Sequence, residues 1–180
     1  MKKPILISAF LLFALINLSA QNVTLDFYIG TWKYENTDTG DEFIIKLRKT
    51  QYEIPSVFGG GTDDCLVGVY SLKKNNQLIQ NNFEKFHETL NPNSYPILIL
   101  DGLNGNHTDL LLSVKDYTLT NSKGKYKFLS PCHIYFKTLS PKTINWVIKI
   151  AEQELLFTAP EDRFPAGTNL PTNLILTKVE

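Results

Sequence analysis

After its first twenty residues the chain has no second long apolar run, and it carries no excess of either charge. Its 18 basic residues balance 18 acidic ones, and the lysines are scattered along the sequence. A nucleic-acid-binding domain needs a basic patch, and a protein that lies on anionic lipid needs a polybasic stripe. We therefore expect no nucleic-acid partner, no lipid-surface binding and no membrane span in the mature chain.

Helical periodicity, internal repeats and domain linkers are also missing from the sequence. Without helical patterns between the strands, a parallel α/β sheet is disfavoured. What remains is one domain over residues 21–180, which at this length buries about 70% of its unfolded surface.

Residues 1–20 are predicted to be a secretory signal peptide. Two lysines precede the apolar run Ile5–Ile16, and small residues follow before Gln21, in the order typical of such signals. The run is shorter than the roughly 20 apolar residues that cross a membrane. We expect cleavage after Ala20 and export to the periplasm or the medium. An uncleaved anchor is the alternative.

Only two cysteines are present, Cys65 and Cys132. In an exported protein an even pair can form a disulfide, which for a loop of this length would stabilise the fold by about 4 kcal/mol. Buried free thiols, which pack as small apolar groups, are the alternative. The sequence leaves both open.

Apolar and polar residues alternate along most of the mature chain, which predicts strands. Phe43, Ile45 and Leu47 share one face of the first clear example. In residues 125–130 the rings of Tyr126 and Phe128 alternate with lysines, which predicts that the rings face the core. Turn-rich stretches separate these runs at hairpin-like intervals. Further strands are predicted at residues 65–72, 96–102, 109–117, 132–139, 143–150, 154–159 and 173–180.

An open sheet of eight to ten antiparallel strands would leave unpaired backbone groups along its edge strands, and closure into a barrel removes those edges. A β-sandwich is the competing solution. A short helical turn is predicted before the first strand, in residues 22–30, and another in residues 81–90. The predicted fold class is all-β, a single antiparallel up-and-down β-barrel of about 8–10 strands with a short N-terminal helical turn.

The motif Gly30-Thr31-Trp32 favours the barrel. Glycine allows a tight turn into the first strand, and the large indole of Trp32 can close one end of a barrel. This opening resembles the N-terminal signature of the calycin superfamily, the lipocalins and fatty-acid-binding proteins. In those families a basic residue of the last strand packs across the tryptophan, and Lys178 is the residue that matches here.

The chain is also similar to small exported calycin-like proteins of Bacteroidetes, a group that brings no known activity with it. Other lipocalin motifs and the fatty-acid-binding helical lid are missing. The resemblance implies a lipocalin-like barrel with a small apolar or amphipathic ligand. If the interior holds one, we expect an inward-facing lining of Phe43, Ile45, Leu112, Phe128, Trp146 and Phe157. Residues 54–64 and 159–172 are expected to frame the mouth.

No catalytic or metal-binding constellation stands out. The three histidines lack the spacing of a zinc site, and the neighbours Cys132 and His133 would point to opposite faces of a strand. We expect a protein that is not an enzyme and has no cofactor. Two functions stay open: a carrier of a small hydrophobic ligand, or a filled barrel that acts through its surface on another envelope component.

Overall fold

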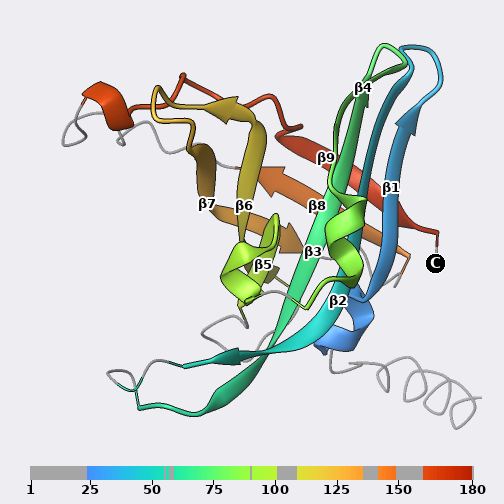
Figure 1. Cartoon of the computed structure of the whole chain (residues 1–180). Coiled ribbons are helices and arrows are strands. Elements are labelled where there is room, and N and C mark those ends of the chain that lie inside the picture. The colour runs from blue at the N-terminus through green and yellow to red at the C-terminus, as the bar shows by residue number, and fades with distance from the viewer. Residues whose placement is uncertain are drawn as a thin grey trace, which may run out of the picture.

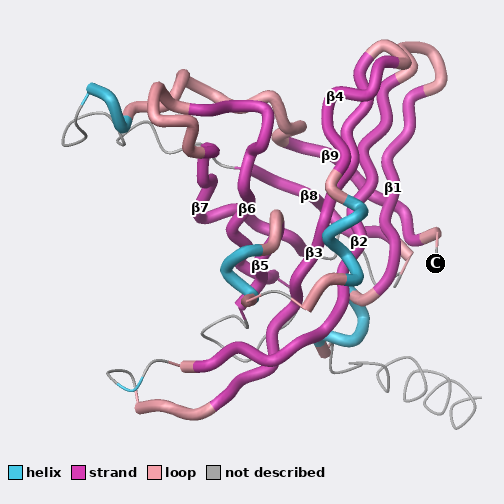
Figure 2. The backbone as a smooth tube through the Cα atoms, in the orientation of Figure 1, coloured by secondary structure: helices cyan, strands magenta, loops and turns pink. Residues whose placement is uncertain are grey.

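The computed structural model describes residues 24–54, 56, 59–89, 91–100, 109–135, 142–148 and 160–179. Antiparallel strands dominate this part of the chain (Figures 1 and 2). The nine strands are β1 (Gly30–Asn36), β2 (Asp41–Glu53), β3 (Thr62–Lys74), β4 (Gln77–Asn81), β5 (Ile97–Leu100), β6 (Asp109–Thr120), β7 (Tyr126–Tyr135), β8 (Thr143–Ile148) and β9 (Asn173–Lys178). Four short 3-10 helices accompany them: η1 (Leu25–Tyr28), η3 (Phe83–His87), η4 (Pro92–Ser94) and η6 (Pro160–Asp162).

The strands form one curled sheet in the order β2-β1-β9-β8-β7-β6-β5-β3-β4. Because β2 also pairs with β3, the strand pairings run in a ring, and β4 is attached outside it next to β3. The all-β, antiparallel, barrel-like fold is therefore confirmed. The predicted helical turn before the first strand is also present, as η1. The predicted signal peptide, residues 1–20, and the predicted strand 154–159 lie outside the described residues.

Alternation in β2 is as predicted, with Phe43, Ile45 and Leu47 buried and their neighbours more exposed. In β3 both faces are buried from Cys65 to Leu72. The second face is buried because residues 82–89 and 91–96 lie over the outside of β2 and β3 (Figure 1). There Lys46 packs on the ring of Phe83.

The prediction of which face of β7 is buried was wrong. Tyr126 and Phe128 are 49% and 47% exposed, whereas Lys127 and Leu129 are buried. A register shift between β6 and β7 falls next to Leu129. Burial of Lys127 is compensated because its ammonium group donates to two backbone carbonyls. Phe128 is therefore a surface residue, and Leu129 takes the core position.

A core of large side chains fills the inside of the sheet. Trp32, Trp146, Tyr28, Tyr70 and Phe43 are its largest fully buried members. The ring of Phe43 lies edge-on to that of Trp146, with 5.0 Å between the ring centroids. Within the described ranges, no helix is both long enough and apolar enough to cross a membrane.

Candidate functional site

One end of the barrel is closed by Trp32. Gly30, at the start of β1, has a φ of 126°, a conformation that favours glycine. The indole of Trp32 is fully buried, and its Nε1 donates to the carbonyl of Tyr28 in η1 at 2.8 Å. This bond satisfies the only polar atom of the indole, so the ring can be buried at little cost.

Lys178 completes this closed end. It is paired in register with Trp32 across β1 and β9, and its ammonium nitrogen lies 5.3 Å from the indole centroid. The same nitrogen donates to the carbonyl of Phe27 at 3.3 Å. The structure thus brings together Gly30, Trp32 and Lys178, the residues singled out in the sequence for barrel closure.

The interior next to this end is packed. Of the residues expected to line a cavity, Phe43, Ile45, Leu112 and Trp146 have at most 2% of their surface exposed and belong to one continuous core cluster. The fifth, Phe128, is on the outside, and the sixth, Phe157, lies outside the described residues. These four residues pack against other side chains of that cluster.

The opposite end is covered by residues 160–172, which we call the crossing segment. Its middle is held by Asp116, a fully buried residue of β6. The carboxylate of Asp116 accepts hydrogen bonds from the hydroxyl group of Thr168 and the backbone N–H of Asn169. It also accepts from the backbone N–H and the hydroxyl of Thr118. Four donors thus compensate the burial of this charge.

Lys127 holds the same stretch from the neighbouring strand. It is paired in register with Asp116, and its ammonium group donates to the carbonyls of Pro165 and Gly167 at 2.9 and 2.8 Å. Leu170 then inserts its side chain into the core, where it is 2% exposed. The crossing segment is therefore fixed by part-buried hydrogen bonds and by the buried side chain of Leu170.

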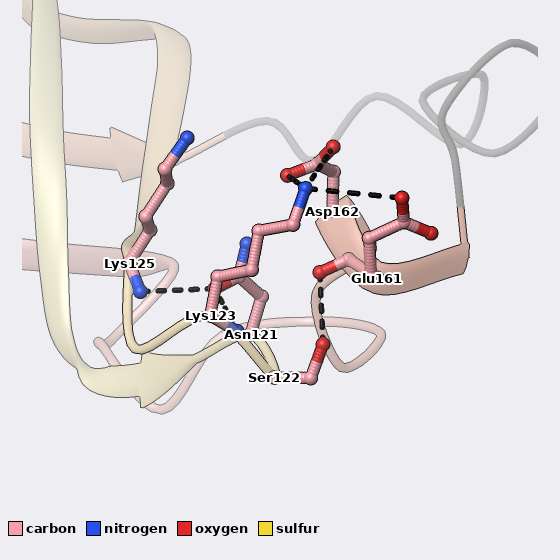
Figure 3. Close-up of polar contacts among 6 residues, drawn as sticks. All are labelled: Asn121, Ser122, Lys123, Lys125, Glu161 and Asp162. Carbon is pink, nitrogen blue, oxygen red and sulfur yellow. Dashed lines mark hydrogen bonds and ion pairs between the residues drawn. The ribbon is translucent and has the colours of Figure 1, made fainter.

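The start of the crossing segment is fastened to the β6–β7 turn (Figure 3). The ammonium of Lys123 lies 2.9 Å from both carboxylate oxygens of Asp162, which lowers the pKa of that carboxyl. Ser122 donates to the carbonyl of Glu161 at 2.9 Å. Asn121 stabilises the turn itself, because its side-chain oxygen accepts from the backbone N–H groups of Lys123 and Lys125.

The end of the crossing segment meets β8 and β9. Trp146 Nε1 donates to the carbonyl of Pro171 at 2.8 Å, and the backbone N–H of Ile148 donates to the carbonyl of Thr172 at 2.8 Å. Contacts from β6, β7 and β8 therefore fasten this segment along the second end of the barrel.

A small pocket remains beside it, at the rim. Its volume is about 120 Å³. Its walls combine apolar side chains with four charged residues, and it is lined by Tyr34, Asp41, Glu42, Phe43, Leu72, Lys73, Lys74, Pro171 and Leu174. Since drug-sized ligands occupy pockets of about 300–1,000 Å³, this one has room only for a small group or the tip of a chain.

Glu42 is the charged centre of that rim. Its carboxylate lies 2.8 Å from the ammonium of Lys73 and 2.9 Å from that of Lys33. The hydrogen bond from Lys73, more than any other contact, lowers the pKa of Glu42 below its ordinary value of 4.5. A carboxylate held between two ammonium groups stays ionised, so it is poorly suited to act as a general acid.

The two loops expected to frame one mouth lie at opposite ends of the barrel. The crossing segment follows β8 at the end where β2 begins, whereas the β2–β3 connection leaves the other end of β2. Figure 1 shows the β2–β3 hairpin extending away from the rest of the sheet. Only Pro171, from the second predicted loop, lines the pocket.

Cys65 is a free, buried thiol. Burial raises its pKa to about 11, with smaller effects from Asp64 and Asp63. It lies on β3, three strands away from β7, which carries Cys132, because β5 and β6 lie between them. At about 4.8 Å between strands, that separation is too great for a disulfide. The free-thiol alternative therefore holds for Cys65, and the side chain of Cys132 lies outside those described.

Several residues that fix the second end were not found from the sequence. Asp116, Lys127 and Leu170 read there as parts of a strand or a loop, and none belongs to a motif. Their roles depend on contacts between segments about 40 to 50 positions apart. In the described part of the chain, no three His, Cys, Asp or Glu residues are grouped to hold a metal ion.

Fold and site together define an antiparallel, barrel-like all-β protein whose second end is covered by the crossing segment. Over residues 1–179 the sequence matches a protein family described as a family of unknown function, DUF6705, and the chain belongs to that family. No curated protein and no solved structure matches the chain.

Proposed function

We propose that this protein is a non-enzymatic binding module whose barrel is a packed scaffold and whose outer surface contacts its partner. The observation that carries this proposal is the burial of Phe43, Ile45, Leu112 and Trp146, which fill the interior. A barrel of eight strands has just enough room for side chains or for one small ligand. We infer that side chains occupy that room here.

The proposed setting is the cell envelope or the medium, with residues 1–20 acting as an export signal. We also propose a relationship to the calycins. It is supported by η1, by Gly30 and Trp32 at the start of β1, and by Lys178 stacked on the indole. The family to which the chain belongs has no stated activity, so this relationship adds an expectation about fold rather than about chemistry.

A second candidate function is the binding of a small apolar or amphipathic molecule in the rim pocket. The observation in its favour is the combination of apolar walls from Phe43, Leu72 and Leu174 with the nearby charges of Glu42 and Lys73. A molecule bound there would insert only a short apolar part and leave its polar end at the rim.

A thermal-shift screen of fatty acids, quinones and other small amphiphiles separates the two functions, because a ligand that binds only the folded state raises the melting temperature. The surface-binding proposal predicts no shift with any of them. A shift that Leu174→Phe abolishes would favour the rim pocket and overturn the proposal. Ile175→Phe is the matched control, since Ile175 is the next residue on β9 and is 43% exposed.

A further inference from the structure

Three aromatic rings and two lysines lie together on the outer face of β6 and β7. The rings of Tyr117 and Tyr126 have their centroids 4.5 Å apart. Phe128 lies two residues from Tyr126 on β7 and is paired in register with Lys115 of β6. Lys85, from η3, places its ammonium group 4.6 Å from the centroid of Tyr117. We call this group of five residues the aromatic platform.

Two of the three rings of the platform are half-exposed, whereas Tyr117 is partly buried and packs against the core. Tyr126 and Phe128 keep 49% and 47% of their surface in contact with solvent. Large aromatic side chains are enriched at binding surfaces, and exposed apolar patches mark interaction sites. The rings of Tyr126 and Phe128 therefore leave apolar surface on the outside of β7 that a partner can contact.

The two lysines give this surface a positive charge that the described residues do not neutralise. Neither Lys85 nor Lys115 forms an ion pair in the described part of the chain. The ammonium of Lys115 donates instead to the carbonyl of Asn93 at 2.7 Å. Burial and the charge of Lys85 lower the pKa of Lys115. An anion placed between the two lysines would relieve their mutual repulsion.

The size of the platform limits the kind of partner that it fits. A fully buried aromatic side chain contributes about 150–250 Å², so two half-exposed rings offer roughly 200 Å². A stable protein interface needs about 800 Å² on each partner. Nucleic acid, which carries one phosphate per nucleotide, needs a broad basic surface, whereas this platform holds two cations. A ligand of one or two rings with a single anionic group matches both the small apolar area and the two cations of the platform.

We propose that the aromatic platform binds an acidic saccharide. The C–H face of a sugar ring packs on Tyr126 and Phe128, and a carboxylate or sulfate on that sugar accepts hydrogen bonds from Lys115 and Lys85. This inference rests on the proposed function, because it names the chemistry of the partner that the outer surface contacts. It involves no covalent step.

The test is equilibrium binding of the full chain to polygalacturonate, dextran sulfate and uncharged dextran, with polyglutamate and a single-stranded DNA oligonucleotide alongside. We expect binding to polygalacturonate or dextran sulfate, whose different acidic groups identify the anion, and no binding to dextran. Tyr126→Ala and Phe128→Ala should each weaken that binding about tenfold, the effect of losing one stacked ring. Lys115→Gln and Lys85→Gln should also weaken it.

The matched controls are Ile175→Ala and Lys142→Gln, which change an exposed aliphatic residue and an exposed lysine outside the platform. Both should bind within twofold of the wild type. Because Tyr126 and Phe128 are surface residues, an unchanged melting temperature shows that their variants are folded. Equal binding to polyglutamate, tighter binding to DNA, or no binding to either acidic polysaccharide would overturn the inference. A bound small molecule inside the barrel would instead overturn the proposed function.

Discussion

Lys178 and Trp32 join the two ends of the described chain at one end of the barrel. They are paired in register on β9 and β1, and the ammonium of Lys178 lies 5.3 Å from the indole centroid. Next to this contact the backbone N–H of Val179 donates to the carbonyl of Thr31 at 2.9 Å. The pairing of first and last strands therefore depends on a side-chain contact as well as on backbone hydrogen bonds.

Replacement of Trp32 by alanine should lower the free energy of unfolding by about 3–5 kcal/mol, because it removes the largest buried side chain of this end and leaves a cavity. Lys178→Gln should cost only about 0.5–2 kcal/mol, the strength of one cation–π contact. Lys178→Arg, which keeps the charge over the ring, is the control. Chemical denaturation measures all three. A Trp32→Ala variant as stable as the wild type would show that the indole does not close the barrel.

Removal of the Asp116 carboxylate should loosen the crossing segment. Asp116→Ala leaves the part-buried donors of Thr168 and Asn169 without their acceptor, at a cost of about 1–3 kcal/mol. Amide hydrogen exchange at Asn169 and Leu170 should become faster. The control is Lys123→Gln, which breaks an exposed ion pair of the same segment and should cost less than about 1 kcal/mol. Unchanged exchange in Asp116→Ala would mean that the other contacts of the segment hold it without Asp116.

Glu42 should make the stability of the fold depend on acid pH. Its pKa in the folded protein is lower than its ordinary value of 4.5, so folding favours the carboxylate. The stabilisation is therefore fully present above pH 4.5 and is lost as the pH falls through the lowered pKa. Below pH 4.5 the unfolding free energy of Glu42→Gln should fall less steeply than that of the wild type. Glu53→Gln, at an exposed position of the same strand, should retain the slope of the wild type.

The thiol of Cys65 should react slowly in the folded protein. It is buried, and its pKa is raised to about 11, so the reactive thiolate is scarce near neutral pH. In a Cys132→Ser background, iodoacetamide should label Cys65 much more slowly in buffer than in denaturant. Equal rates in the two conditions would contradict the burial of this thiol.

Much of the fold could be predicted because its signals are local. The alternation of Phe43, Ile45 and Leu47 indicated a half-buried strand, and Gly30 with Trp32 indicated where the first strand begins. Which face of β7 is buried could not be predicted in this way, because both of its faces carry long side chains. Lys127 is buried only because carbonyls of a distant segment accept its hydrogen bonds. Leu129 rather than Phe128 then packs in the core.

The candidate site was less accessible to sequence reasoning. Trp32 was found because it belongs to the motif Gly30-Thr31-Trp32 at the first strand. Lys178 was found because it is the basic residue of the last strand. Asp116 and Leu170 were not, since a carboxylate in a strand and a leucine in a loop are ordinary residues until the segment 160–172 folds over the rim. Whether Phe43 and Trp146 line a cavity or fill a core also depends on how closely their neighbours approach, which periodicity does not encode.

The central claim is that the barrel interior is filled by its own side chains. Native mass spectrometry of the protein purified from its own host tests this most directly, because a ligand held inside the barrel would remain bound and add its mass. We expect the mass of the bare polypeptide, beginning at or near Gln21. A stoichiometric additional mass that is lost when the protein is unfolded would contradict it.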